Sequence, residues 1–209
     1  MLIEEARREL RRYSSKEKAI ILRRYFKTGP GEYAQGDIFI GVQVPDTRKV
    51  ARKFQHLPLD KTLRLLRSSI HEERLLALLI LIGKFRDADE RGKEKIYTAY
   101  LGHTRFINNW DLVDLSALNI VGAFLADKGK QPLYTLARSA SLWERRIAIL
   151  ATFYFIRNKR FQDAFKIAAL LLSDEHDLIH KAAGWMLREV GKRDEKALAV
   201  LDKILDAGS

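Results

Sequence analysis

Cysteine is absent from the 209 residues of this sequence. Its absence excludes disulfide bonds, a thiol nucleophile and cysteine-based metal sites, and it fits a reducing compartment. The chain also lacks an uninterrupted apolar run of the ~18 residues that a membrane-spanning helix needs. Its first residues form a charged helical pattern without the apolar segment of a signal peptide. We therefore expect a cytoplasmic protein, of a bacterial or archaeal cytosol or nucleoid, with no membrane partner.

Motifs for nucleotides and metals are missing too. Gly29-Pro30-Gly31 lacks the Lys-Ser/Thr pair of a phosphate-binding loop and follows no strand. His176 and His180 stand four residues apart and would share a helix face, but the sequence offers no third ligand beside them. We expect neither a metal nor an organic cofactor.

Proline is scarce, with four in the chain, and no segment alternates as a strand does. Apolar residues instead recur with helical spacing. Ser14 or Ser15 caps a helix that runs to Tyr25, and several glycines mark 28–44 as the one long loop. Pro45 starts the next helix. Further helices are expected at 59–67, 70–85, 88–101, 110–127, 131–139, 142–157, 161–172, 176–190 and 194–205.

Four of these helices repeat one pattern of a polar first turn followed by an apolar run. The repeated segments begin at 71, 108, 142 and 176, which are 37, 34 and 34 residues apart, and each follows a shorter amphipathic helix. A period of this length is typical of two-helix repeats of the HEAT type, which bury their apolar faces only by stacking. We predict an all-α fold, an α-solenoid of stacked HEAT-like antiparallel helix pairs, as a single domain over 1–209. The alternative is an irregular helical bundle with accidental spacing.

The formal charge of +11 predicts a polyanionic partner, nucleic acid first and an anionic membrane surface second. In a solenoid, the first turns of successive inner helices line one concave face. Those turns carry a row that is basic with an acidic break, which predicts a concave basic groove. The row consists of Arg74, Asp111 with Asp114, Arg145 with Arg146, and His180 with Lys181.

The acidic break is the run Asn109-Trp110-Asp111-Leu112-Val113-Asp114. Trp110 and Asp114 are four residues apart and share a helix face. An indole and a carboxylate inside an anion-binding groove indicate chemistry, although a capped helix start with Trp110 in the core would give the same pattern. Trp185 follows Gly184, a helix-interior glycine, and so borders either an open surface or the core.

Four blocks of the chain resemble the AlkD-like DNA alkylation repair glycosylases, in the order and nearly the spacing of that family. The similarity extends over roughly residues 15–195. The blocks are Gly41-Val42-Gln43-Val44-Pro45-Asp46-Thr47-Arg48, Asn109-Trp110-Asp111-Leu112-Val113-Asp114, Trp143-Glu144-Arg145-Arg146-Ile147-Ala148-Ile149-Leu150 and Lys181-Ala182-Ala183-Gly184-Trp185-Met186-Leu187-Arg188-Glu189.

The resemblance implies a HEAT-like solenoid that cradles double-stranded DNA and excises cationic N3- and N7-alkylated purines such as 3-methyladenine and 7-methylguanine, without a cofactor. Trp110, Asp114 and Trp185 match the residues that surround the deoxyribose of the lesion. Asp111 is left with a capping or supporting role. The positions that match DNA contacts are Arg146, Arg188, Gln43, Arg48 and Tyr33, and the groove row adds Lys181 and Arg74.

The expected activity is that of a monomeric, monofunctional glycosylase of base excision repair. The alternatives are a non-catalytic relative that binds damaged or branched DNA, and a HEAT-type protein scaffold, which the basic row disfavours. One departure concerns the end of the chain, since related chains usually continue with another basic helix after the position of Leu205. The last helix pair is therefore expected to be shortened or missing.

Overall fold

The computed structural model describes residues 2–198 of the chain. Its contacts divide the protein into two compact units, Met1–Leu112 and Val113–Ser209, and the boundary falls inside helix α7 (Trp110–Ser116). The expected helix at 194–205 and the expected shortening after Leu205 lie largely outside the described residues. Each unit is described by itself below.

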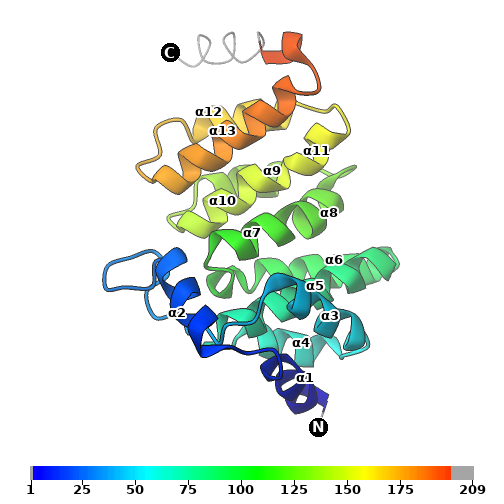
Figure 1. The fold of residues 1–209 in the computed structure, drawn as a ribbon. Helices are drawn as coiled ribbons and strands as arrows, with labels where there is room; N and C mark the ends of the chain where they lie inside the picture. The colour runs from blue at the N-terminus through cyan, green and yellow to red at the C-terminus, as the bar shows by residue number, and fades with distance from the viewer. Residues whose placement is uncertain (1, 199–209) are drawn as a thin grey trace. The chain divides into compact units, whose positions relative to one another are not determined.

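In the first unit, α5 is the central helix. It packs against α3, α4 and α6, and α1 packs on α3 and α4 (Figure 1). α5 buries side chains on every side, as a helix surrounded by others must. The helices of this unit are α1 (Leu2–Arg11), α2 (Lys16–Tyr25), α3 (Val44–Lys53), α4 (Leu59–Leu66), α5 (His71–Asp87) and α6 (Glu90–Leu101), with the 3-10 turn η1 (Thr104–Phe106).

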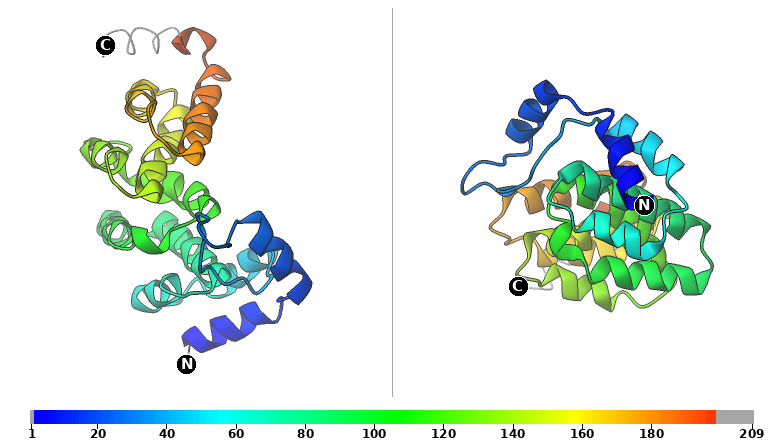
Figure 2. Two further views of the ribbon diagram at one scale, coloured as in Figure 1. Left: turned by 90° about the vertical axis from the view of Figure 1, so that its left-hand side faces the viewer. Right: turned by 90° about the horizontal axis from the view of Figure 1, so that it is seen from below.

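In the second unit, α10 is the central helix. It packs against α9, α11, α12, α13 and the π-helical segment η2, and α12 lies beside α13 (Figure 1, Figure 2). After most of α7 come η2 (Ala117–Gly122), α8 (Ala123–Leu125), α9 (Gln131–Ala137), α10 (Leu142–Ala151), α11 (Phe153–Arg157), α12 (Gln162–Leu170), α13 (Asp177–Gly191) and the 3-10 turn η3 (Glu195–Leu198).

These helices confirm the predicted all-α fold of adjacent helix pairs. Over residues 2–198 there is no strand, only an isolated parallel bridge between Ile38 and Ile70. Ser15 caps α2 through its hydroxyl, which accepts a hydrogen bond from the Lys18 amide. The helix expected at 142–157 is wrong in one respect, because it breaks at the buried Thr152 into α10 and α11.

The same hydrogen-bond pattern recurs at the starts of α5 and α10. The Ser68 hydroxyl accepts from the Ile70 amide, and Arg74 Nη1 donates to the Ser68 carbonyl at 3.0 Å. Likewise, the Ser139 hydroxyl accepts from the Ser141 amide, and Arg145 Nη1 donates to the Ser139 carbonyl at 3.0 Å. The sequence period therefore corresponds to one local structure built twice.

Gly122 lets α10 approach the helical stretch that begins at α7. A Cβ atom at this position would lie 2.3 Å from the Ala151 carbonyl oxygen at the end of α10. A backbone oxygen cannot move away as a flexible side chain can, so any larger residue would push α10 outward. This contact lies between η2, which follows the helix that carries Asp114, and α10, which carries Arg146.

The predicted loop over 28–44 is present, and a buried carboxylate fixes its end. Glu72, which is 1% exposed, accepts hydrogen bonds from the amides of Ile40, Gly41 and Val42. Gly41 has φ 82°, and a Cβ atom there would meet the Ser15 carbonyl at 2.0 Å. This anchoring places Gln43 at the start of α3.

Candidate active site

Asp114 and Arg146 form a two-point ion pair in the second unit. Arg146 Nε and Nη2 donate to the two carboxylate oxygens of Asp114, each at 2.8 Å. The Asp114 side chain is 19% exposed and that of Arg146 is 7% exposed. This geometry fixes the carboxylate plane and favours the ionised form, because both oxygens accept charge-assisted hydrogen bonds. The Asp114 side chain is thus held firmly but is not fully buried.

Arg146 has a third partner, the Leu178 carbonyl in the first turn of α13, to which its Nη1 donates. The guanidinium thus joins α7, α10 and α13. The DNA-backbone contact expected of Arg146 would have to be made beside these bonds or in place of them. In this structure two of its three hydrogen bonds go to Asp114.

Trp110 lies in an aromatic cluster of the first unit. Its ring stacks on Phe26 with centroids 5.1 Å apart, and Tyr25 meets it edge-on at 5.7 Å. A hydrogen bond joins Trp110 to the Tyr33 hydroxyl, although burial dominates and raises the pKa of Tyr33. The structure therefore brings Tyr33 to Trp110.

An apolar pocket of about 410 Å³ adjoins this cluster. Trp110 forms part of its wall, and Gln43 lies at its polar edge, where the amide oxygen accepts from Lys18 at 3.0 Å. The lining residues are Leu22, Tyr25, Phe26, Phe39, Val42, Gln43, Val44, Pro45, His71, Glu72, Leu75, Trp110 and Asp111.

Asp111 supports the start of α7, as expected of a capping or supporting residue. Its Oδ1 accepts from the Leu112 amide at 2.9 Å, and its Oδ2 lies 2.8 Å from His71 Nε2. The other ring nitrogen of His71 faces Asp37 Oδ2 at 3.2 Å. Sequence reasoning missed His71 and Asp37, because no motif or spacing links residues this far apart.

Arg74 belongs to the same buried network. It is 3% exposed, and its Nη2 donates to Asp37 Oδ2 at 2.7 Å. A DNA contact by Arg74 would require its guanidinium to leave the buried Asp37 carboxylate. The shared serine-arginine spacing of 68–74 and 139–145 is the sequence signal that could have identified this arginine as a structural one.

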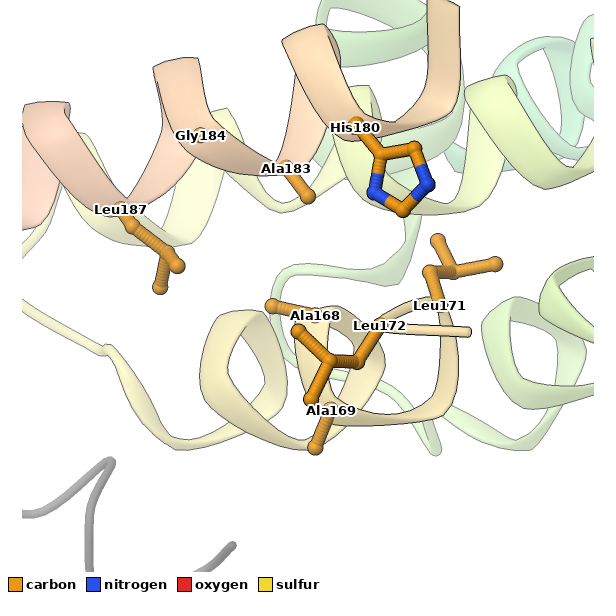
Figure 3. Close-up of a pocket in the computed structure, with 8 residues that line it drawn as sticks. All are labelled: Ala168, Ala169, Leu171, Leu172, His180, Ala183, Gly184 and Leu187. Carbon is orange, nitrogen blue, oxygen red and sulfur yellow. The ribbon is translucent and has the colours of Figure 1, made fainter. Parts of the chain in front are cut away.

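Trp185 is partly buried in the second unit, where its ring lies 5.9 Å from that of Phe153. A Cβ atom at the neighbouring Gly184 would meet nothing within 4 Å, so this glycine borders open space. Gly184 lines an apolar pocket of about 200 Å³ between α12 and α13, together with His180 and Leu187 (Figure 3). The sequence left Trp185 beside either an open surface or the core, and the structure shows a partly buried ring next to a glycine that borders open space.

The remaining sites expected to contact DNA are exposed. Gln43 and Arg48 lie in the first unit, and Lys181 and Arg188 lie on α13 in the second. Lys181 forms a surface ion pair with Asp177 at 2.6 Å. Exposed pairs of this kind are weak and can be exchanged for a phosphate.

Among residues 2–198, no group of three His, Asp or Glu side chains is arranged so that it could hold a metal ion, and the ring of His180 faces the Asp174 carbonyl. In the same range, no helix combines the length and the hydrophobicity needed to cross a membrane.

The chain is similar to DNA alkylation repair enzymes in sequence and in fold. A family model described as DNA alkylation repair enzyme matches residues 6–200. A solved structure of a predicted DNA alkylation repair enzyme from Enterococcus faecalis has a similar fold, with a TM-score of 0.68 and 18% sequence identity, over 92% of this chain and 90% of that chain. No curated protein sequence matches.

Proposed function

We propose that this chain, which belongs to the DNA alkylation repair enzyme family, is a DNA glycosylase of base excision repair. In this proposal it hydrolyses the N-glycosidic bond of cationic N3- and N7-alkylated purines, such as 3-methyladenine and 7-methylguanine, in double-stranded DNA. It acts as a monomer in the cytoplasm or nucleoid. The observation that carries the proposal is the Asp114 carboxylate, held at two points by Arg146 and still partly open to solvent.

Excision of a cationic base is helped by an ionised carboxylate and does not need a general acid. Alkylation at N3 or N7 leaves the purine positively charged, so the base departs as a neutral molecule and needs no proton. The positive charge of the transition state then lies on the sugar, which becomes like an oxocarbenium ion. An ionised Asp114 stabilises that charge and can orient the attacking water. Its rigid pairing with Arg146 supports this role, since a preorganised charge need not reorient during the reaction.

The indole rings of Trp110 and Trp185 are proposed to stand beside the same sugar. An indole face attracts a nearby positive charge by ~1–2 kcal/mol when water is excluded. Trp110 is suited to such a role because Phe26, Tyr25 and Tyr33 fix its ring. In the proposed mechanism the base stays in the stack while the sugar is attacked from the groove.

DNA binding is proposed to use a basic concave groove. Its direct phosphate contacts come from exposed groups, namely Arg48, Lys181 and Arg188, with Gln43 and Tyr33 near the lesion. Arg146 is proposed to attract the DNA phosphates electrostatically while its guanidinium stays bonded to Asp114. For Arg74 we now propose an indirect role, because its guanidinium is buried against Asp37.

The test is release of 7-methylguanine from methylated duplex DNA, identified by mass spectrometry, for the wild type and Asp114→Asn. We expect the variant to lose about 10²–10³-fold in single-turnover rate, the size typical of removing one preorganised electrostatic group. Asp127→Asn is the matched control, since that carboxylate is 90% exposed and pairs only with the surface Arg160. Equal rates for the wild type and Asp114→Asn would refute the role of Asp114. DNA binding without base release would favour the non-catalytic alternative.

A further inference from the structure

We propose that His71 is held as an imidazolium between Asp37 and Asp111, and that this cation positions the start of α7 for the reaction proposed above. His71 is thereby a positioning residue, since its ring is buried and reaches the proposed chemistry only through Asp111 and Trp110. The inference rests on the proposed function for its catalytic consequence. Its structural part, the protonation and the anchoring, can be measured without any activity.

The geometry leaves each ring nitrogen facing a carboxylate. Nε2 lies 2.8 Å from Asp111 Oδ2, and Nδ1 lies 3.2 Å from Asp37 Oδ2. A neutral imidazole has one N–H donor and one lone pair, so one carboxylate would then face a lone pair. His71 is 1% exposed, so bulk solvent has almost no access to relieve that repulsion. Only the doubly protonated ring donates to both carboxylates.

The charges that face the ring support the same conclusion. Asp37 and Asp111 carry two negative charges, and Arg74, bound to Asp37 at 2.7 Å, carries one positive charge. A positive His71 makes this group neutral, whereas a neutral His71 leaves one uncompensated negative charge in the interior. Burial by itself lowers the pKa of His71, but the charge of Asp111 and the hydrogen bonds to Asp111 and Asp37 outweigh it, and Arg74 opposes them only in part. The pKa rises to about 8.

The ring also supports Trp110 by packing. The ring of His71 packs against two aromatic neighbours, with Phe39 stacked at 4.4 Å and Phe26 tilted at 5.2 Å between centroids. Phe26 in turn stacks on Trp110 at 5.1 Å. His71 therefore reaches the first turn of α7 by two routes, through Asp111 and through the aromatic stack. Loss of its charge would loosen both Trp110 and the turn that leads to Asp114.

The first experiment is NMR of the imidazole groups in the full chain, with His71→Gln used to assign the signal. We expect protons on both ring nitrogens at pH 7 and a titration near pH 8. A ring that is neutral at pH 7 would overturn the proposal. Asp37→Asn should lower the measured pKa of His71, and no change in that variant would also contradict it.

The second experiment compares two conservative variants. The amide of His71→Gln lies where Nε2 was and can still donate to Asp111, whereas that of His71→Asn replaces Nδ1 and serves Asp37. If Asp111 is the route to the site, single-turnover excision at pH 7 falls by roughly 10- to 100-fold in His71→Asn and by less in His71→Gln, as expected of a misplaced reacting group. Equal losses, or the reverse order, would refute positioning through Asp111.

A third measurement separates this inference from the glycosylase proposal. The fluorescence of Trp110, taken as the difference between the wild type and Trp110→Phe, should change as the pH rises through about 8, where His71 loses its proton. The change should vanish in His71→Gln. A difference spectrum that is constant from pH 6 to 9 would overturn the anchoring of Trp110, whether or not the protein excises bases. The positioning of Trp110 by the His71 imidazolium is therefore present below about pH 8 and lost above it.

Discussion

The starts of α5 and α10 are two copies of one local structure that differ at the next residue. In both, a serine carbonyl accepts from the arginine six residues later, and that arginine pairs with a buried aspartate, Asp37 for Arg74 and Asp174 for Arg145. The residue that follows is Leu75 in α5, a core side chain, and Arg146 in α10.

This difference separates the structural arginine of the repeat from the one assigned to the site. Arg74 and Arg145 tie the loop between two helices to the helix that follows, and each has its own carboxylate. Arg146 instead reaches Asp114, and no such pair exists at Leu75. The first-turn arginines of the predicted groove therefore have two different roles: Arg74 and Arg145 support the fold, and Arg146 holds Asp114. Substitutions can separate the two roles.

The largest effect is expected when α10 is made like α5 by Arg146→Leu. Asp114 would lose both charge-assisted hydrogen bonds and its fixed orientation. We expect single-turnover excision of 7-methylguanine to fall by about 10²–10³-fold. Arg145→Leu is the control, and its activity per folded molecule should stay within a few-fold of the wild type. Comparable losses in both variants would erase the distinction drawn here.

The structural arginines should dominate stability. Arg74→Met leaves Asp37 buried with only His71 as a charged partner, and removal of one member of a buried pair costs ~3–5 kcal/mol. Arg145→Met should cost less, because the Arg145 side chain is 19% exposed against 4% for Arg74. Urea unfolding measures both free energies. A smaller loss for Arg74→Met than for Arg145→Met would contradict the burial argument.

Gly122 and Gly184 should differ in how an alanine substitution changes the stability of the protein. Gly122→Ala would force a Cβ atom against the Ala151 carbonyl and should destabilise the protein by ~1–3 kcal/mol. Gly184→Ala meets nothing within 4 Å and should stabilise α13 by ~0.5–1 kcal/mol. Thermal unfolding of the two single variants is the measurement, and destabilisation by Gly184→Ala would mean that the pocket of Figure 3 is closed in solution.

The smallest effect concerns an exposed cation of the proposed groove. Lys181→Gln should reduce the slope of log binding constant against log salt by about 0.9, the value for one phosphate contact. Lys159→Gln, an exposed lysine in the turn after α11, is the matched substitution and should leave the slope unchanged. Fluorescence anisotropy with a DNA duplex gives both slopes. Identical slopes for the two variants would remove Lys181 from the interface.

The sequence alone determined where most helices lie, their pairing and the long loop. Apolar residues at helical spacing, caps such as Ser15 and glycines near 28–44 act locally, so they could be interpreted without the fold. It also identified the run from Trp110 to Asp114 and its likeness to a repair family. The break at Thr152 escaped prediction, since the pattern of apolar residues continues across it.

Tertiary structure decided which charges meet. That Arg146 holds Asp114 while Arg145 pairs with Asp174, and that His71 lies between Asp37 and Asp111, depend on residues at least 29 positions apart. Sequence periodicity gives the face of a helix but not its neighbour across the core. Because a buried charge is stable only with its partner, the folded core, and not the local pattern, sets the role of each arginine and histidine.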